Sequence, residues 1–112
     1  ELIKYKGFQV APAELEGLLM EHPAVLDAAV IQVIDRAQET EVPKAFVVVR
    51  PDLRSADIAE DIRAWVAERV VHYKALRGGV ELVESIPKSA SGKILRRVLR
   101  DIEAGRLKTA KL

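Results

Sequence analysis

The sequence predicts an α+β domain in which helices flank a small three-stranded antiparallel sheet, with a separate β-hairpin at the N-terminus. Three observations predict this class. Some short segments are rich in β-branched residues or alternate apolar with polar residues, as strands do. Longer segments repeat apolar residues every three or four positions, as one face of a helix does. Glycine and proline separate the segments, and helices interleaved with short strands are typical of α+β domains.

The hairpin is predicted from the alternation at the start of the chain. Lys6 and Gly7 suit a two-residue turn, in which Gly7 supplies a positive φ. Such a turn places Lys4 opposite Gln9 on one face of the hairpin. That polar face is either a solvated outer surface or a pair of ligand-binding side chains. The apolar residues of the other face are Ile3, Tyr5, Phe8 and Val10.

The next elements are a helix and two strands. The helix begins near Pro12, carries acidic residues in its first turns and leucines at helical spacing, and stops at residues 22–23. The β-branched segment 25–33 and the segment 44–50 are expected to be strands that pair antiparallel. Residues 35–43 are expected to form a polar loop between them.

The second half of the chain predicts two more helices around a short strand. The chain breaks at residues 78–79, both glycine, and 80–83 supply the strand. A loop of small and polar residues at 87–92 leads to a basic helix that starts at about Ile94. The apolar stripe of the earlier helix is Ile58, Ile62, Trp65, Val66 and Val70, and that of the last helix is Leu95, Val98, Leu99 and Ile102.

Composition excludes several classes of function. A net charge of +1, from 18 basic and 17 acidic residues, gives no field that would concentrate nucleic acid, so no nucleic-acid partner is expected. No apolar run approaches the roughly 20 residues of a membrane span. The chain has no cysteine, and His22 and His72 are its only imidazoles, so we expect no metal site.

The segment 87–97, PKSASGKILRR, delivers Lys93 to the start of a predicted helix. Helix N-termini carry partial positive charge, so Lys93, Arg96 and Arg97 are each unfavourable there by about 0.3–1 kcal/mol unless an anion offsets them. An anionic ligand or an acidic partner would resolve this conflict. The alternative is a solvated basic face whose long side chains point to water.

Two long motifs resemble one known family. Residues 1–16, ELIKYKGFQVAPAELE, resemble the opening of the C-terminal domain in 4-coumarate-CoA ligases and beetle luciferases. Residues 87–97 are similar to the closing motif of the same adenylate-forming superfamily, and the intervening stretch matches in order and length. The resemblance implies that residues 1–112 form the small, mobile C-terminal domain of an AMP-forming ligase and that the large N-terminal adenylation domain lies outside this chain.

The resemblance also implies roles for particular residues. Lys93 would bridge the carboxylate substrate and the ATP phosphates during adenylation, in one of two domain poses. In the other pose Lys4 and Gln9 would enter, while Lys6 and Gly7 border the channel for coenzyme A. The implied cofactors are ATP, with its magnesium counter-ion bound by the absent domain, and coenzyme A. The isolated domain is expected to be inactive.

Two other functions share this domain. A luciferase-type adenylating monooxygenase would oxidise its adenylate, and it would differ in the absent domain. A non-enzymatic module would dock its basic terminal helix on an acidic partner.

The last three residues resemble a targeting signal. Ala110, Lys111 and Leu112 are similar to the Ser-Lys-Leu tripeptide that the peroxisomal import receptor reads at a C-terminus. The sequence therefore predicts a peroxisomal location, with the cytoplasm as the alternative.

Overall fold

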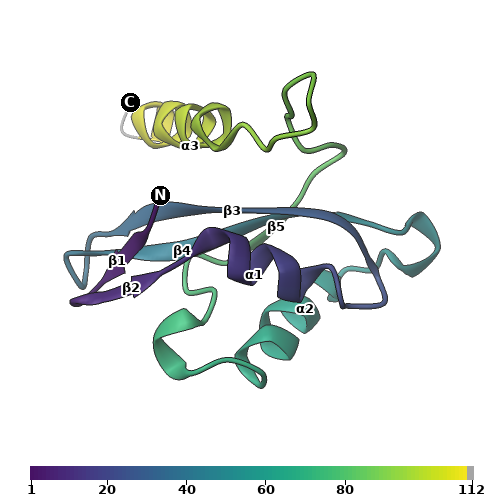
Figure 1. Ribbon diagram of the computed structural model, residues 1–112, viewed down its shortest axis with the longest axis horizontal. Helices are drawn as coiled ribbons and strands as arrows, with labels where there is room; N and C mark the ends of the chain where they lie inside the picture. The colour runs from purple at the N-terminus through teal and green to yellow at the C-terminus, as the bar shows by residue number, and fades with distance from the viewer. Residues whose placement is uncertain (111–112) are drawn as a thin grey trace.

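The computed structural model describes residues 1–110 and arranges them in three layers. Helices α1 (Pro12–Leu19) and α2 (Ile58–Ala67) cover one face of a central sheet, and helix α3 (Arg96–Ala110) covers the other (Figure 1). A two-stranded hairpin stands beside the sheet at one end (Figure 1). The expected α+β class is therefore confirmed.

The sheet has three strands in the order β3-β4-β5, and it is mixed rather than fully antiparallel. Strand β3 (Val25–Asp35) pairs antiparallel with β4 (Thr40–Val49), as expected. Strand β5 (Val80–Leu82), however, runs parallel to β4. The physical reason is the intervening helix α2, which carries the chain back across the sheet so that β5 starts at the same end as β4.

Both long strands extend further than the sequence predicted, so the polar loop shrinks to residues 36–39. Pro43 lies inside β4, opposite Gln32, although proline has no N–H to donate to a strand ladder. It is tolerated because the β5 pairing begins only at Ala45, and the Pro43 carbonyl oxygen accepts a hydrogen bond from the Gly78 N–H at 2.8 Å.

The N-terminal hairpin has the predicted register. Strand β1 (Ile3–Tyr5) pairs antiparallel with β2 (Phe8–Val10). Lys6 and Gly7 connect them with φ values of 46° and 88°, the positive values that a two-residue turn of type I′ requires. Gly7 is thus explained by its backbone conformation.

Short 3-10 helices complete the fold. They are η1 (Pro51–Leu53), which follows β4, and η2 (His72–Lys74), which follows α2.

The core is divided by the sheet into two clusters. Successive residues of β3 alternate between them, so that Val30 belongs to the larger cluster and Ile31 to the smaller, and both side chains are fully buried. The larger cluster joins the sheet to α1, α2 and the hairpin, and the smaller joins it to α3 through Leu99. Both faces of the sheet are therefore packed, and only its ends and edges are left for side chains that could bind a ligand.

Gly78 is confined by its neighbours, and an added methyl group should destabilise the fold. A Cβ at this position would lie 2.8 Å from the Pro43 carbonyl oxygen, 2.8 Å from the Lys44 Cβ and 2.9 Å from the Val33 Cγ2. Backbone and strand atoms have little room to yield, so we predict that Gly78→Ala lowers the free energy of unfolding by about 1–3 kcal/mol in urea titrations.

Gly17 provides the matched control. It lies exposed within α1, and a Cβ there would meet nothing within 4 Å. Gly17→Ala is therefore expected to raise the free energy of unfolding by about 0.5–1 kcal/mol, since alanine favours helix. Equal effects of the two changes would contradict the steric explanation.

Candidate functional site

The structure brings Lys4 and Gln9 together on the outer face of the hairpin. They lie opposite each other in the strand register, and both are exposed. Their neighbours Ile3 and Val10, which face the other way, are fully buried. The predicted pairing of these two hydrogen-bonding side chains is confirmed as geometry.

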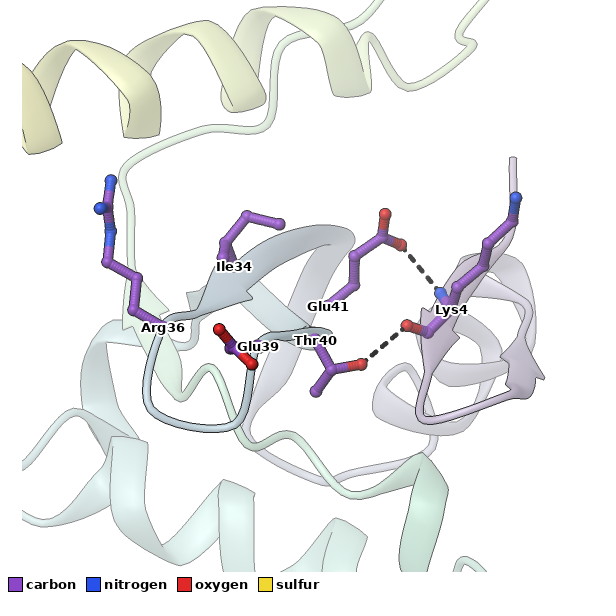
Figure 2. Close-up of a pocket in the computed structure, with 6 residues that line it drawn as sticks. All are labelled: Lys4, Ile34, Arg36, Glu39, Thr40 and Glu41. Atoms are coloured by element: carbon purple, nitrogen blue, oxygen red, sulfur yellow. Dashed lines mark hydrogen bonds between the residues drawn. The ribbon is translucent and has the colours of Figure 1, made fainter.

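Two residues at the start of β4 hold the backbone of this hairpin (Figure 2). The Lys4 N–H donates to Glu41 Oε1 at 2.8 Å, and the Thr40 hydroxyl donates to the Lys4 carbonyl oxygen at 3.1 Å. Thr40 Oγ1 also accepts a hydrogen bond from the Lys6 N–H at 2.9 Å. The Lys4 side chain extends away from Thr40 (Figure 2), so the backbone is fixed while the ammonium group stays available.

A surface hollow lies between the hairpin and the β3–β4 loop (Figure 2). Its lining mixes cationic and anionic side chains with a single apolar one, unlike the mostly apolar pockets that enclose small ligands. It is not a place to bury an acyl chain. The lining residues are Lys4, Ile34, Arg36, Glu39, Thr40 and Glu41.

An aromatic stack supports the other side of the hairpin. Phe8 is 43% exposed, although the sequence alternation placed it on the same apolar face as the buried Tyr5. Its ring lies on that of Tyr73 in η2, with centroids 4.1 Å apart and an interplanar angle of 9°, and His72 meets Phe8 edge-on. Phe8 thus lies outside the buried core and packs instead on the aromatic rings of η2.

Lys93 lies on a tight turn before α3 and is exposed. Ser89 binds its backbone twice: the Lys93 N–H donates to Ser89 Oγ at 3.1 Å, and the Ser89 N–H donates to the Lys93 carbonyl oxygen at 2.9 Å. Gly92 takes a φ of 87°, which permits the turn. The backbone of Lys93 is therefore anchored, and its side chain has no ion pair within residues 1–110.

The expected charge conflict at the start of the last helix is largely resolved inside the domain. Helix α3 begins at Arg96, so Lys93 precedes it. The Arg96 guanidinium forms a bidentate ion pair with Glu16, with distances of 3.1 Å from Nε to Oε2 and 2.5 Å from Nη2 to Oε1. The anion that Arg96 requires is thus a side chain of α1, and the hypothesis that it needs an external anion is wrong.

Glu16 is a structural residue that sequence reasoning missed. It is only 8% exposed, and its Oε2 also accepts a hydrogen bond from the Val30 N–H at 2.8 Å. The sequence analysis used the acidic residues only as a sign of where the helix starts, whereas Glu16 lies on the same face of α1 as Leu15 and Leu19, which are fully buried. A carboxylate on a buried face requires a partner, and that requirement was the available signal.

A second group of ion pairs ties α3 to the sheet. Lys44 Nζ lies 2.7 Å from Glu103 Oε1 and 3.0 Å from Glu81 Oε1. Arg106 Nη1 reaches the same Glu81 oxygen at 2.5 Å. Burial alone would raise the pKa of Glu81, but the hydrogen bonds from Arg106 and Lys44 lower it overall, so the carboxylate stays charged.

The two candidate surfaces are far apart. The hairpin β1–β2 lies at one end of the sheet, and the loop that carries Lys93 lies above the sheet on the α3 side, displaced toward the other end, where Lys88 pairs with Asp27 of β3 at 2.7 Å (Figure 1). Lys4 and Gln9 are thus brought together with each other, and Lys93 is not brought to them.

The arrangement matches a known family of domains. Residues 14–93 match the model of the AMP-binding enzyme C-terminal domain, which covers more than half of the chain. The chain belongs to this family.

Relatives of this AMP-binding C-terminal domain are CoA ligases. This chain is 55% identical over 101 residues to 4-coumarate--CoA ligase-like 1 of Arabidopsis thaliana. It is 50% identical over 101 residues to the phenylacetyl-CoA ligase epaB of Aspergillus niger. Each alignment covers 90% of this chain and 18% of the relative. The chain thus spans about a fifth of the length of the relatives it matches.

Solved structures agree. The acyl-CoA synthetase of Brucella canis superposes with a TM-score of 0.86 at 34% identity, over 96% of this chain and 20% of that one. The anthranilate CoA ligase AuaEII, in complex with anthranoyl-AMP, superposes with a TM-score of 0.80 at 36% identity, over 90% of this chain and 19% of that one.

None of the helices described here has the length and apolar character needed to traverse a bilayer. Residues 1–110 also contain no group of three or more His, Asp or Glu side chains placed to hold a metal ion.

We predict that Glu16→Gln lowers the free energy of unfolding by about 2–3 kcal/mol, because it leaves the partly buried Arg96 without an anion. Glu14→Gln on the same helix is the control, since Glu14 is 54% exposed in its pair with Lys74. That change should cost less than about 1 kcal/mol. Urea titration of the two variants measures both values, and similar losses would show that Glu16 is no more than a surface charge.

Proposed function

We propose that this chain is the small domain of an AMP-forming carboxylic acid:CoA ligase. The observation that carries the proposal is the separation of two prepared surfaces, the Lys4–Gln9 face and the Lys93 turn, at opposite ends of one rigid domain (Figure 1). Such a reaction has two chemical steps with different demands, and the relatives are ligases that form CoA thioesters by name. A domain with two separate surfaces could present a different one to the substrate in each step.

The first step is adenylation. A carboxylate oxygen attacks the α-phosphorus of ATP, and the bond to the leaving pyrophosphate breaks. Negative charge builds on the phosphate oxygens, and the Lys93 ammonium would stabilise it from a backbone already held by Ser89. A preorganised donor of this kind typically contributes about 10²–10³ in rate.

The second step forms the thioester. The sulfur of coenzyme A attacks the acyl carbonyl carbon, and AMP leaves. Lys4 and Gln9 would face the reacting groups here, with Lys6 and Gly7 beside the pantetheine arm. Because the two surfaces lie at opposite ends of the domain, the domain must rotate between the steps.

Other components belong with the large domain in this proposal. Residues 1–110 offer no acidic cluster for a metal ion, so the magnesium that accompanies ATP would be held elsewhere. The hollow beside Lys4 does not suit an acyl chain, so the acid would also be bound outside this chain.

The ion pairs disfavour the docking-module alternative. Arg96, Arg100 and Arg106 all pair with carboxylates inside the domain, namely Glu16, Glu1 and Glu81. Much of the basic charge of α3 is thus already neutralised and offers little to an acidic partner.

Separate assays of the two steps in the full-length protein test the assignment. Lys93→Ala is expected to slow pyrophosphate release about 10²–10³-fold and to leave thioester formation from supplied acyl-adenylate intact. Lys4→Ala combined with Gln9→Ala should slow the second step and leave the first. Arg97→Ala, which removes an exposed cation near Lys93, is the control and should change neither. If both steps survive Lys93→Ala unchanged, the domain is a scaffold.

We also propose that peroxisomal import is directed by Ala110, Lys111 and Leu112. Lys111 and Leu112 lie outside the described residues, so the support is the similarity of the tripeptide to Ser-Lys-Leu. A fluorescent protein that ends in residues 107–112 should collect in peroxisomes, seen by colocalisation with a matrix marker. The same fusion with Lys111→Glu should stay diffuse, and equal distributions of the two would count against the address.

A further inference from the structure

An exposed apolar strip begins just before helix α3 and continues along it, formed by Leu95, Val98 and Ile102. Their exposed fractions are 37%, 41% and 44%, whereas the neighbouring Leu99 is 3% exposed and packs on the sheet. The sequence placed all four on one packed side of the helix. Val98 and Ile102 are four residues apart and share one flank of α3, and Leu95 lies next to them at the start of the helix, where its carbonyl oxygen accepts a hydrogen bond from the Val98 N–H at 3.1 Å.

The helix cannot roll to bury this strip. Its other flank is fastened to the domain by Arg96 on Glu16, by Arg100 on Glu1 and by Glu103 on Lys44. Turning the strip toward the sheet would break these pairs and leave the buried carboxylate of Glu16 without its cation. Within the part of the chain that the structure describes, nothing covers the strip, so a cover must come from elsewhere.

We infer that the strip of Leu95, Val98 and Ile102 docks on the large adenylation domain of the same protein while Lys93 occupies the adenylation site. This rests on the proposed function. The chain spans 18–20% of its relatives, so most of such a protein lies outside the structure and is available as the partner. Leu95 follows Lys93 by two residues, so inserting the lysine brings the start of the strip against the partner surface.

The docking is specific to one pose. The Lys4–Gln9 face lies at the other end of the sheet, so the rotation that brings it forward withdraws the end that carries Lys93 (Figure 1). The strip then loses its cover. Its burial consequently favours the adenylation pose over the thioester pose, because apolar area leaves water in only one of them.

The test uses the full-length protein with Val98→Asn and Ile102→Asn combined. Pyrophosphate release should fall about tenfold, while thioester formation from supplied acyl-adenylate stays within about twofold of the parent. The control combines Met20→Asn and Val71→Asn, which are 48% and 47% exposed and follow α1 and α2 on the opposite side of the sheet. The control should leave the ratio of the two rates unchanged.

Several outcomes would overturn the inference. Unchanged rates for both steps would do so, and so would an equal loss of both steps together with a lower melting temperature, which would show a merely structural role. If Met20→Asn with Val71→Asn lowered pyrophosphate release as much as Val98→Asn with Ile102→Asn, the effect would not be specific to the strip, and the inference would also fail.

A crosslinking measurement does not depend on activity. With the photoreactive amino acid p-benzoylphenylalanine at position 102, illumination in the presence of ATP and acid should crosslink to peptides of the large domain, and the same probe at position 71 should not. Crosslinks to a second copy of the chain would overturn the inference in favour of self-association. If the parent protein forms no adenylate, the proposed function fails, and the crosslinks still decide whether the strip docks.

Discussion

The buried carboxylate of Glu16 is the interaction on which the rest of this domain depends. It receives the backbone N–H of Val30 and the guanidinium of Arg96, so one side chain joins α1, the edge strand β3 and the start of α3. A carboxylate so far from water is tolerated only with such partners. The turn that presents Lys93 precedes Arg96 directly, so its direction relative to the sheet is set by this joint. The position of the Lys93 turn is therefore fixed by a side chain from a different layer of the domain.

The sheet separates two surfaces whose residues lie far apart in the sequence. One core cluster holds the hairpin, α1 and α2, and the other holds α3. At the hairpin end, Thr40 and Glu41 hold the backbone beside Lys4. At the other end, Ser89 holds the backbone of Lys93. Lys4 and Lys93 thus each extend from an anchored backbone, and no residue is shared between the two anchors.

Features that depend on residues close together in the sequence were predicted, whereas features that depend on distant residues were not. The pairing of Lys4 with Gln9 followed from a two-residue turn and strict alternation, which leave one register. The direction of β5 did not follow, because a three-residue strand carries no signal of orientation. The pair of Glu16 with Arg96 joins residues 80 positions apart, beyond the reach of any periodicity. The sequence could indicate that Glu16 and Arg96 each required a partner of opposite charge. Only the packing of the three layers determines that they pair with each other.

The attachment of α3 has a consequence for how the domain responds to its solvent. Within residues 96–106 only Leu99 is buried, so the helix rests on the sheet through little apolar contact and many ion pairs. Several of these are partly open to water, including Arg106 at 52% exposure, where dissolved ions weaken attraction over about 8–10 Å. Helices α1 and α2 are held mainly by the larger apolar cluster, so salt weakens their attachment less. Ionic strength therefore acts most strongly on the element that follows Lys93, and salt changes the attachment of α3 more than that of α1 and α2.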